Sequence, residues 1–423
     1  MTAAVLAAPP AAAQTGWEPL PPSPLAPRGF HTAVWTGSEM VVWGGSAAGR
    51  LFADGAAYDP AVGTWRRLAR SPLARRTGHT AVWTGRQMLV WGGCCDRDGR
   101  EFQDGAAYDP GRDRWRPLPP APISERTAHA AVWTGTEMVV WGGHVFAEEF
   151  ADGAAYDPQR DRWRVLPKAR VRGRSGHTAV WTGTEMIMWG GATRRGVLVD
   201  GAAYDPAADR WRSVSPAPIP GRSAHVAVWT GAAMMVWGGC CDPQGRELFD
   251  GASYDPAADA WGSLPQGPLT PRQLHTGVWT GERMVVWGGR AGLDQYPPDV
   301  GGYLAGTGAW LRMRRGPLVP RAAHTAVWTG DRMVVWGGCC TAQQEGYADG
   351  AALPLSVEPP PPTPTPSPTP SPAPSPTGPA VPASPSLPEP RDTSPALPIM
   401  LGGGAVVLAL IGVLAARRRR GSP

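Results

Sequence analysis

A block of residues recurs seven times along the chain, and this repeat constrains the fold more than any other feature. The string His-Thr-Ala-Val-Trp-Thr-Gly, with small variations, returns at intervals of 48 to 50 residues. Its first residues are His31, His79, His129, His177, His225, His275 and His324. Each string is followed by Trp-Gly-Gly, and five repeats then carry Asp-Gly-Ala-(Ala/Ser)-Tyr-Asp-Pro and a further Trp. Self-similarity at such a period indicates an array of equivalent supersecondary units.

Each repeat predicts four short β-strands. In the first copy, residues 31–35 and 40–43 are apolar and β-prone and are separated by a Thr-Gly turn. Residues 56–58 and 65–68 form a second pair around an Asp-Pro turn. No segment between them has helical periodicity. Four antiparallel strands per repeat are typical of a propeller blade, so the sequence predicts an all-β, seven-bladed β-propeller.

The tryptophans predict how the ring closes. Of the 21 tryptophans, twenty fall at three recurring places in the repeats, and the remaining one is Trp17. The segment 16–20 around Trp17 reads as a fourth strand without its first three, whereas the last repeat stops after Leu353 without a closing Trp. We therefore expect the N-terminal strand to complete the seventh blade, which removes an open sheet edge.

The order Gly-Gly, Tyr, Trp within each repeat resembles kelch repeats and differs from the Gly-His and Trp-Asp marks of WD40 repeats. The resemblance covers about residues 14–353. It implies a propeller of the galactose oxidase-like superfamily, in which closure by a terminal strand is familiar. It also implies that the loops after Gly-Gly and the linkers between blades share one face, at the mouth of the central channel.

The flanking segments predict a membrane-anchored protein. Residues 1–13 are small and apolar and resemble the end of a signal peptide, and residues 354–395 form a Pro/Ser/Thr-rich stalk. Residues 396–416 lack charges and are long enough for a transmembrane helix, and the tail 417–423 begins with four arginines. Cationic flanks stay in the cytoplasm, so we expect a single-pass cell-membrane protein with its propeller outside. The absence of Asn and the single Lys indicate bacterial coding bias.

One recurrent set of residues is a candidate binding site. An arginine precedes each repeat histidine by three residues: Arg28, Arg76, Arg126, Arg174, Arg222, Arg272 and Arg321. The resemblance places them at the channel mouth, where guanidinium groups would attract the carboxylates of acidic peptides or acidic glycans. The alternative is a structural role in salt bridges between blades or in hydrogen bonds to the backbone. The histidines and methionines that follow the same period are expected to have structural roles.

The loops after Gly-Gly vary most, and all six cysteines lie in them as adjacent pairs. The pairs are Cys94 and Cys95, Cys240 and Cys241, and Cys339 and Cys340. Export favours oxidation. The three blades concerned are not neighbours, so we expect a vicinal disulfide within each pair. No C-x-x-C spacing supports a zinc site.

We expect a recognition module that binds a protein or an acidic glycan through the loop face, without cofactor or metal. Net charge is +5, and four of these charges lie in the tail, so no nucleic-acid partner is expected. The off-period residues His144, Tyr296 and Tyr347 on the same face are further candidate binding residues. The first alternative is a carbohydrate-active enzyme of the galactose oxidase or sialic acid mutarotase type, with these three residues at its site. The second is an envelope spacer without a specific ligand. No phosphate loop, nucleophile elbow or paired-carboxylate motif supports catalysis.

Overall fold

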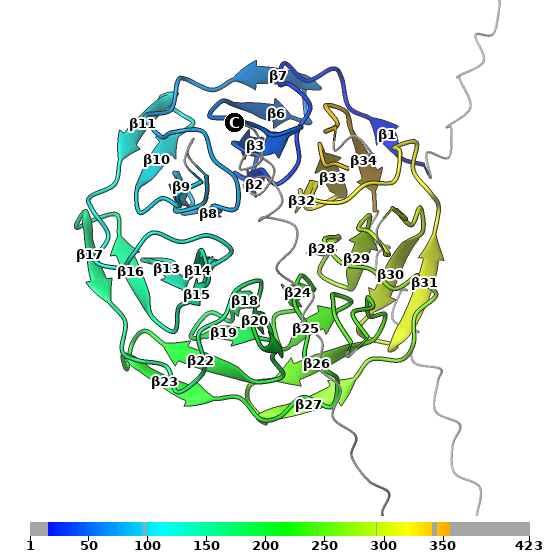
Figure 1. Ribbon diagram of the computed structural model, residues 1–423. Coiled ribbons are helices and arrows are strands. Elements are labelled where there is room, and N and C mark those ends of the chain that lie inside the picture. Colours follow the sequence, from blue (N-terminus) through cyan, green and yellow to red (C-terminus); the bar gives the residue numbers. More distant parts are fainter. Residues whose placement is uncertain (1–15, 96–98, 243, 293, 341–344, 356–423) are drawn as a thin grey trace, which may run out of the picture. The chain divides into compact units, whose positions relative to one another are not determined.

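Seven four-stranded antiparallel sheets, the blades of a propeller, surround a central channel (Figure 1). The computed structural model describes residues 16–95, 99–242, 244–292, 294–340 and 345–355. The seven-bladed architecture predicted from the sequence is confirmed. The signal-like segment, the transmembrane segment and the basic tail lie outside the described residues, as does the stalk apart from residues 354 and 355. Within the described ranges, no helix is long and apolar enough to cross a bilayer.

Each blade runs from an inner strand at the channel to an outer strand at the rim. The inner strands are β2 (Thr32–Trp35), β8 (Thr80–Trp83), β12 (Ala130–Trp133), β18 (Thr178–Trp181), β24 (Val226–Trp229), β28 (Thr276–Trp279) and β32 (Thr325–Trp328). The second strands are β3 (Met40–Trp43), β9 (Met88–Trp91), β13 (Met138–Trp141), β19 (Met186–Trp189), β25 (Met234–Trp237), β29 (Arg283–Trp287) and β33 (Arg332–Trp336).

The third strands are β6 (Gly55–Asp59), β10 (Gly105–Asp109), β16 (Gly153–Asp157), β22 (Gly201–Asp205), β26 (Gly251–Asp255), β30 (Val300–Leu304) and β34 (Gly350–Pro354). The outer strands are β7 (Thr64–Arg67), β11 (Arg114–Pro117), β17 (Arg162–Val165), β23 (Arg210–Ser213), β27 (Ala260–Ser263), β31 (Ala309–Met313) and β1 (Glu18–Pro19). Blade 1 comprises β2, β3, β6 and β7, and the other blades are numbered in chain order.

The core consists of the contacts between neighbouring blades. The second strands have sequences such as Met-Val-Val-Trp, and each of these residues is buried because both faces of the sheet are covered by adjacent blades. Burial of apolar area contributes about 25 cal/mol per Å². Seven apolar clusters result, one for each pair of neighbouring blades.

The N-terminal strand closes the ring, as predicted. Strand β1 pairs with β34 in the last blade, with Glu18 opposite Ala352 and Pro19 opposite Ala351. The Trp17 ring lies 5.5 Å from that of Trp287, and its indole nitrogen donates to the Arg314 carbonyl at 3.2 Å. The two ends of the propeller domain are thus joined in one sheet.

The Gly-Gly motif of one blade fits against the repeat histidine of the next. Gly44 has a φ of +73°, and a Cβ there would lie 2.6 Å from His79 Cε1. The His79 ring packs edge-on against Trp43, with 5.0 Å between ring centroids. A side chain at position 44 would therefore separate the two blades, which explains why glycine recurs at this place.

The repeat histidines also bind the inner strand of the preceding blade. In five blades, Nε2 lies 2.7 to 2.9 Å from the hydroxyl of a threonine there: His31 with Thr325, His79 with Thr32, His129 with Thr80, His225 with Thr178, and His324 with Thr276. The other two histidines, His177 and His275, face Ala130 and Val226, and their Nε2 atoms lack a partner. Burial lowers the pKa of His31, His79, His177 and His275 to about 3.

Candidate functional site on the loop face

The two ends of the propeller differ in construction. One end carries the tight turns that join inner to second strands and third to outer strands, and we call it the turn face. The other end carries the loops that follow the second strands and the linkers that enter the inner strands, and we call it the loop face. Binding residues lie disproportionately on loops held by a rigid scaffold, so the loop face is the candidate site.

The seven recurrent arginines lie beneath the loop face and are completely buried. Each has 0% exposure and pairs with an aspartate of its own blade. The pairs are Arg28 with Asp54, Arg76 with Asp104, Arg126 with Asp152, Arg174 with Asp200, Arg222 with Asp250, Arg272 with Asp299, and Arg321 with Asp349, with N–O distances of 2.5 to 3.0 Å. Arg28 also donates to the carbonyls of Ala26 and Gly44. The geometry is that of the structural alternative, except that the ion pairs lie within blades.

Four of these arginines are also covered by an aromatic ring from the loop above. The guanidinium carbons of Arg28, Arg76, Arg126 and Arg321 lie 3.9 to 4.2 Å from the ring centroids of Phe52, Phe102, Phe150 and Tyr347. Such cation–π contacts are strongest when water is excluded. Each loop is therefore fastened to its blade by an arginine that binds an aspartate and the start of the loop.

A belt of backbone hydrogen bonds connects the blades at the channel mouth. The residue just before each repeat histidine has a positive φ, and six of these seven residues donate N–H to the carbonyl of the equivalent residue in the preceding blade. Examples are Phe30 N–H to the Ala323 carbonyl at 2.9 Å and Gly176 N–H to the Ala128 carbonyl at 3.1 Å. Between blades 1 and 2 the hydroxyl of Thr77 donates to the Phe30 carbonyl instead. The mouth is thus a fixed frame around which the loops are arranged.

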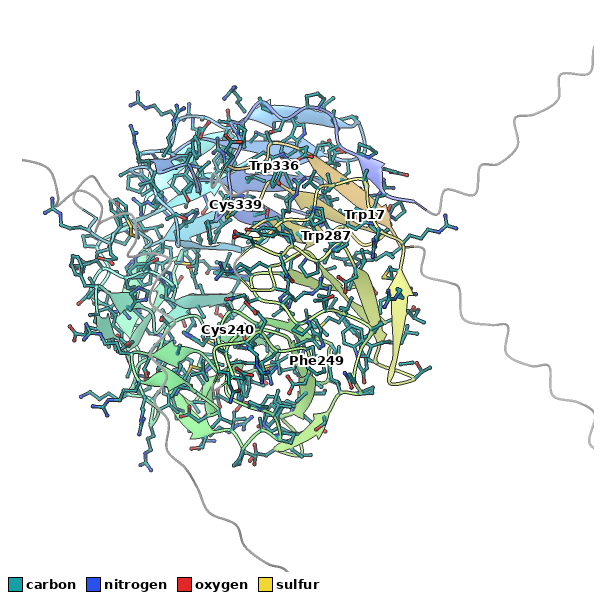
Figure 2. The ribbon with its side chains drawn as sticks, turned by 45° about the vertical axis from the view of Figure 1, so that its right-hand side comes forward. Trp17, Cys240, Phe249, Trp287, Trp336 and Cys339 are labelled. Atoms are coloured by element: carbon teal, nitrogen blue, oxygen red, sulfur yellow. A yellow bond between two sulfur atoms is a disulfide. The ribbon has the colours of Figure 1, made fainter. Side chains whose placement is uncertain are left out.

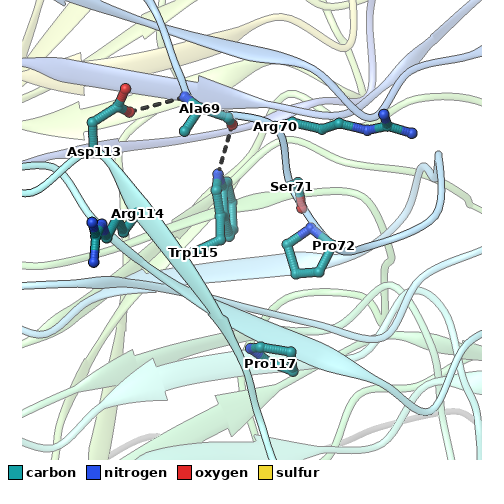
Figure 3. A pocket seen from close by; sticks show the side chains of 8 residues that line it. All are labelled: Ala69, Arg70, Ser71, Pro72, Asp113, Arg114, Trp115 and Pro117. Atoms are coloured by element: carbon teal, nitrogen blue, oxygen red, sulfur yellow. Dashed lines mark hydrogen bonds between the residues drawn. The ribbon is translucent and has the colours of Figure 1, made fainter.

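A shallow hollow at the rim belongs to the recurrent frame. It has a volume of about 440 Å³ and lies between the linker after β7 and strand β11 (Figure 3). Trp115 donates to the Ala69 carbonyl at 3.0 Å, and Asp113 accepts from Ala69 N–H at 2.9 Å. The outer-strand tryptophans of the other blades bind the preceding linker in the same way. We therefore interpret this hollow as part of the recurrent contact between neighbouring blades.

Six of the seven variable loops fall into two classes by length, and the loop of blade 6, residues 290–298, has nine residues and belongs to neither. The eight-residue loops 46–53, 144–151 and 192–199 each close into a small hairpin: β4 (Ser46–Ala47) with β5 (Arg50–Leu51), β14 (His144–Val145) with β15 (Glu148–Glu149), and β20 (Ala192–Thr193) with β21 (Gly196–Val197). The ten-residue loops 94–103, 240–249 and 339–348 begin with the cysteine pairs, and each pair forms a vicinal disulfide. The first cysteine of each pair is buried, and its backbone forms an isolated antiparallel β-bridge with a residue of the linker at the channel mouth.

The three off-period candidates do not form one cluster. His144 lies in the loop of blade 3, whereas Tyr296 and Tyr347 lie in blades 6 and 7. Burial lowers the pKa of His144, against the opposing charges of Glu101 and Glu149. Burial raises the pKa of Tyr296, which lies within electrostatic range of Tyr347. No group of three metal-ligating side chains occurs in the described part of the chain.

The loop face carries most of the large apolar side chains that are exposed among the described residues. Phe30, Phe146, Val199, Phe249 and Val319 lie on its loops and linkers, and the Phe146 side chain at the tip of its hairpin is 67% exposed. Exposed apolar groups of this size, when they gather on one face, are typical of interaction surfaces.

A groove of about 720 Å³ also opens on the loop face, between blades 5 and 6. The loop that begins at Cys240 and ends at Phe249 lines one of its sides. Both residues are labelled in Figure 2. Our sequence interpretation did not include Phe249. A signal was present, because the residue before the aspartate that ends the loop is Ala, Gln, Val or Pro in the other blades.

The comparison with protein families agrees with this geometry. A family model described as the KLHDC2/KLHL20/DRC7 Kelch-repeats domain matches residues 78–268 and, a second time, residues 224–356. The two matches together cover more than half of the 423 residues. No curated protein matches the chain. With this match over more than half of the chain and seven four-stranded blades, the chain belongs to the kelch-repeat propellers.

Proposed function

We propose that this propeller is a protein-binding module that recognises its partner through the loop face, outside the cell membrane. One observation carries the proposal. The recurrent arginine and histidine side chains are buried and bind groups of the blades themselves, whereas the blade-to-blade variation lies in the loops of one face. The exposed apolar side chains and the groove lie on that same face. Kelch propellers are commonly protein-binding modules, and aromatic anchors of this kind are typical of protein interfaces.

The burial of the arginines favours a protein over an acidic glycan. All seven guanidinium groups already bind aspartate carboxylates and lie below the surface. An external anion would have to displace this aspartate, and separating a buried guanidinium from its carboxylate is unfavourable because it leaves a buried charge without its partner. The loops above them offer exposed apolar area, which contributes to binding without this cost.

The location rests on two independent features. The three disulfides fit an oxidising compartment. The uncharged segment 396–416, followed by Arg417 to Arg420, fits a span with its C-terminus in the cytoplasm.

Photo-crosslinking in the native cells tests the proposal. The full-length chain would carry a photo-reactive amino acid at Phe146 on the loop face or at Val62 on the turn face, whose side chains are 67% and 66% exposed. We expect a discrete crosslinked protein from position 146 and none from position 62. Equal crosslinking from both positions, or none from either, would contradict the proposal. Protease added to intact cells should cleave the propeller from the membrane, and full protection would refute the location.

A further inference from the structure

The groove between blades 5 and 6 has walls of two different chemical characters. Its lining comes from the loop of blade 5, the linker to blade 6 and the loop of blade 6: Asp242, Arg246, Glu247, Leu248, Phe249, Thr270, Pro271, Ala291, Gly292, Asp294 and Gln295. One part is apolar, with Leu248, Pro271 and Phe249, whose side chain is 39% exposed. The other part is polar and contains three carboxylates and one guanidinium. The volume of about 720 Å³ lies within the range of about 300–1,000 Å³ found for ligand pockets.

The charges in the groove leave an excess of negative charge. Arg246 binds Asp242 within its own loop, with Nε 2.7 Å from Oδ2. Asp242 also accepts N–H bonds from Gln244 and Arg246, and with that guanidinium they hold its pKa below the usual range although burial acts to raise it. Glu247 accepts from the neutral amide of Gln273, and this bond leaves its charge uncompensated. The exposed Asp294 adds a second carboxylate at the opposite wall.

Other parts of this protein show which side chain an aromatic ring and a carboxylate bind together. In blades 1, 2 and 3, a phenylalanine ring and an aspartate carboxylate together bind an arginine, with the guanidinium 4.0 to 4.2 Å from the ring centroid. The groove offers a phenylalanine and two carboxylates on an open surface. An arginine or lysine from outside would find there an aromatic face for its stem and carboxylates for its charge.

We propose that the groove binds an extended segment of a partner protein by one of its arginine or lysine side chains. This inference rests on the proposed function and adds the partner's chemistry: a cationic side chain on the carboxylates, with apolar flanking residues on Phe249 and Leu248. The loop of blade 5 that forms one wall begins at the Cys240–Cys241 disulfide, so one of the three disulfide-containing loops lines the groove.

The test is a selection of short peptides followed by matched variants. A phage-displayed random library of twelve-residue peptides would be selected on the purified full-length chain, and the affinity of the selected peptides would be measured by fluorescence anisotropy. We expect the selected peptides to share an arginine or lysine whose replacement by alanine weakens binding about tenfold. Phe249→Ala and Asp294→Lys should each weaken binding by a similar factor. Val199→Ala, at the same loop position of blade 4, should change it less than twofold.

The outcomes separate this inference from the proposed function. Peptides that bind without a shared cation, or that bind Phe249→Ala and Asp294→Lys as well as the unchanged chain, would overturn the groove assignment. The loop face would remain the binding surface if such peptides competed with the protein crosslinked from position 146. A library that yields no binding peptide would overturn the groove assignment, and the crosslinking result would then decide the proposed function alone. Circular dichroism of each variant shows that the propeller is intact.

Discussion

At the scale of single residues, the blades differ in one hydrogen bond, between the repeat histidine and a threonine of the preceding blade. Five repeat histidines bind a threonine of the preceding blade, whereas His177 and His275 face Ala130 and Val226 and have no partner at Nε2. A buried polar atom without a partner costs about 1–3 kcal/mol. These two seams therefore lack a stabilising bond that the other five possess.

We predict that Val226→Thr stabilises the protein by about 1 kcal/mol, because the hydroxyl reaches His275 Nε2 in place of a methyl group of the same size. The reverse change, Thr178→Val, removes the partner of His225 at 2.7 Å and should destabilise by about 1–2 kcal/mol. Denaturant unfolding measures both. An equal loss of stability in the two variants would show that the histidine–threonine bond contributes nothing.

Residue roles were predictable from the repeat only up to a point. Recurrence in every blade indicated structural roles for His and Met, and the structure places these side chains between blades. The burial of Arg28 and its equivalents could not be read in the same way, because the direction of their side chains depends on an aspartate 26 to 28 residues further along. The recurrence of an aspartate near this spacing in every blade was the available signal.

At the scale of elements, strands were predictable and loops were not. The strands expected at 31–35, 40–43, 56–58 and 65–68 correspond to β2, β3, β6 and β7 with shifts of one or two residues at most. The same kinds of residue occupy equivalent strand positions from blade to blade, for example in the buried second strands, and this repetition reinforces the pattern. The repeat pattern does not predict the backbone conformation of the loops. The hairpins β4–β5, β14–β15 and β20–β21 and the groove depend on that conformation.

Loop length and cysteine content go together, which suggests what the disulfides do. Every ten-residue loop begins with a cysteine pair, and every eight-residue loop forms a hairpin without cysteine. The disulfide thus occurs where the hairpin ladder is absent, and it restrains the start of the longer loop.

A reducing agent should accordingly loosen the ten-residue loops and leave the others unchanged. We predict faster amide hydrogen exchange in residues 94–103, 240–249 and 339–348 after treatment with a phosphine reductant, and unchanged exchange in 46–53, 144–151 and 192–199. The double variant Cys240→Ser with Cys241→Ser should show the fast exchange in its loop without reductant. Uniform exchange in all six loops would contradict this role.

At the scale of the whole molecule, the buried histidines make stability depend on pH. His31, His79, His177 and His275 have a folded-state pKa of about 3 because of burial, against about 6.5 when unfolded. Between these values the unfolded chain binds more protons, so the free energy of unfolding falls as pH decreases from about 6.5 toward 3. Each such histidine contributes a slope of up to about 1.4 kcal/mol per pH unit.

We therefore predict that the midpoint temperature of unfolding is constant from pH 8 to about pH 7 and falls steeply below about pH 6.5. Carboxylates with lowered pKa values, such as Asp54 and Asp299, lose their ion pairs only near and below their ordinary range, about pH 4. Calorimetry between pH 7.5 and 5 thus isolates the histidines. A midpoint that stays constant down to pH 5 would mean that the histidines are not held neutral by burial.

Closure of the ring depends on the smallest strand in any blade. Strand β1 has two residues and is not joined to β34 by a turn, and it is held by Trp17 on Trp287, by the Glu18–Arg332 ion pair at 3.2 Å and by its two pairings with β34. Without β1, the edge of β34 would be open to pairing with another chain. The closing strand therefore protects the molecule from association in addition to stabilising blade 7.

Removal of residues 1–20 should consequently produce association, whereas a local loss of packing should not. Trp17→Ala keeps the strand and should cost about 3–5 kcal/mol as a buried tryptophan truncation. The truncated chain should in addition form dimers or larger species at micromolar concentration, which light scattering after size exclusion would detect. Trp261→Ala, in an outer strand that a turn joins to its blade, is the control and should remain monomeric. A monomeric truncated chain with unchanged thermal unfolding would show that β1 neither stabilises blade 7 nor protects the edge of β34.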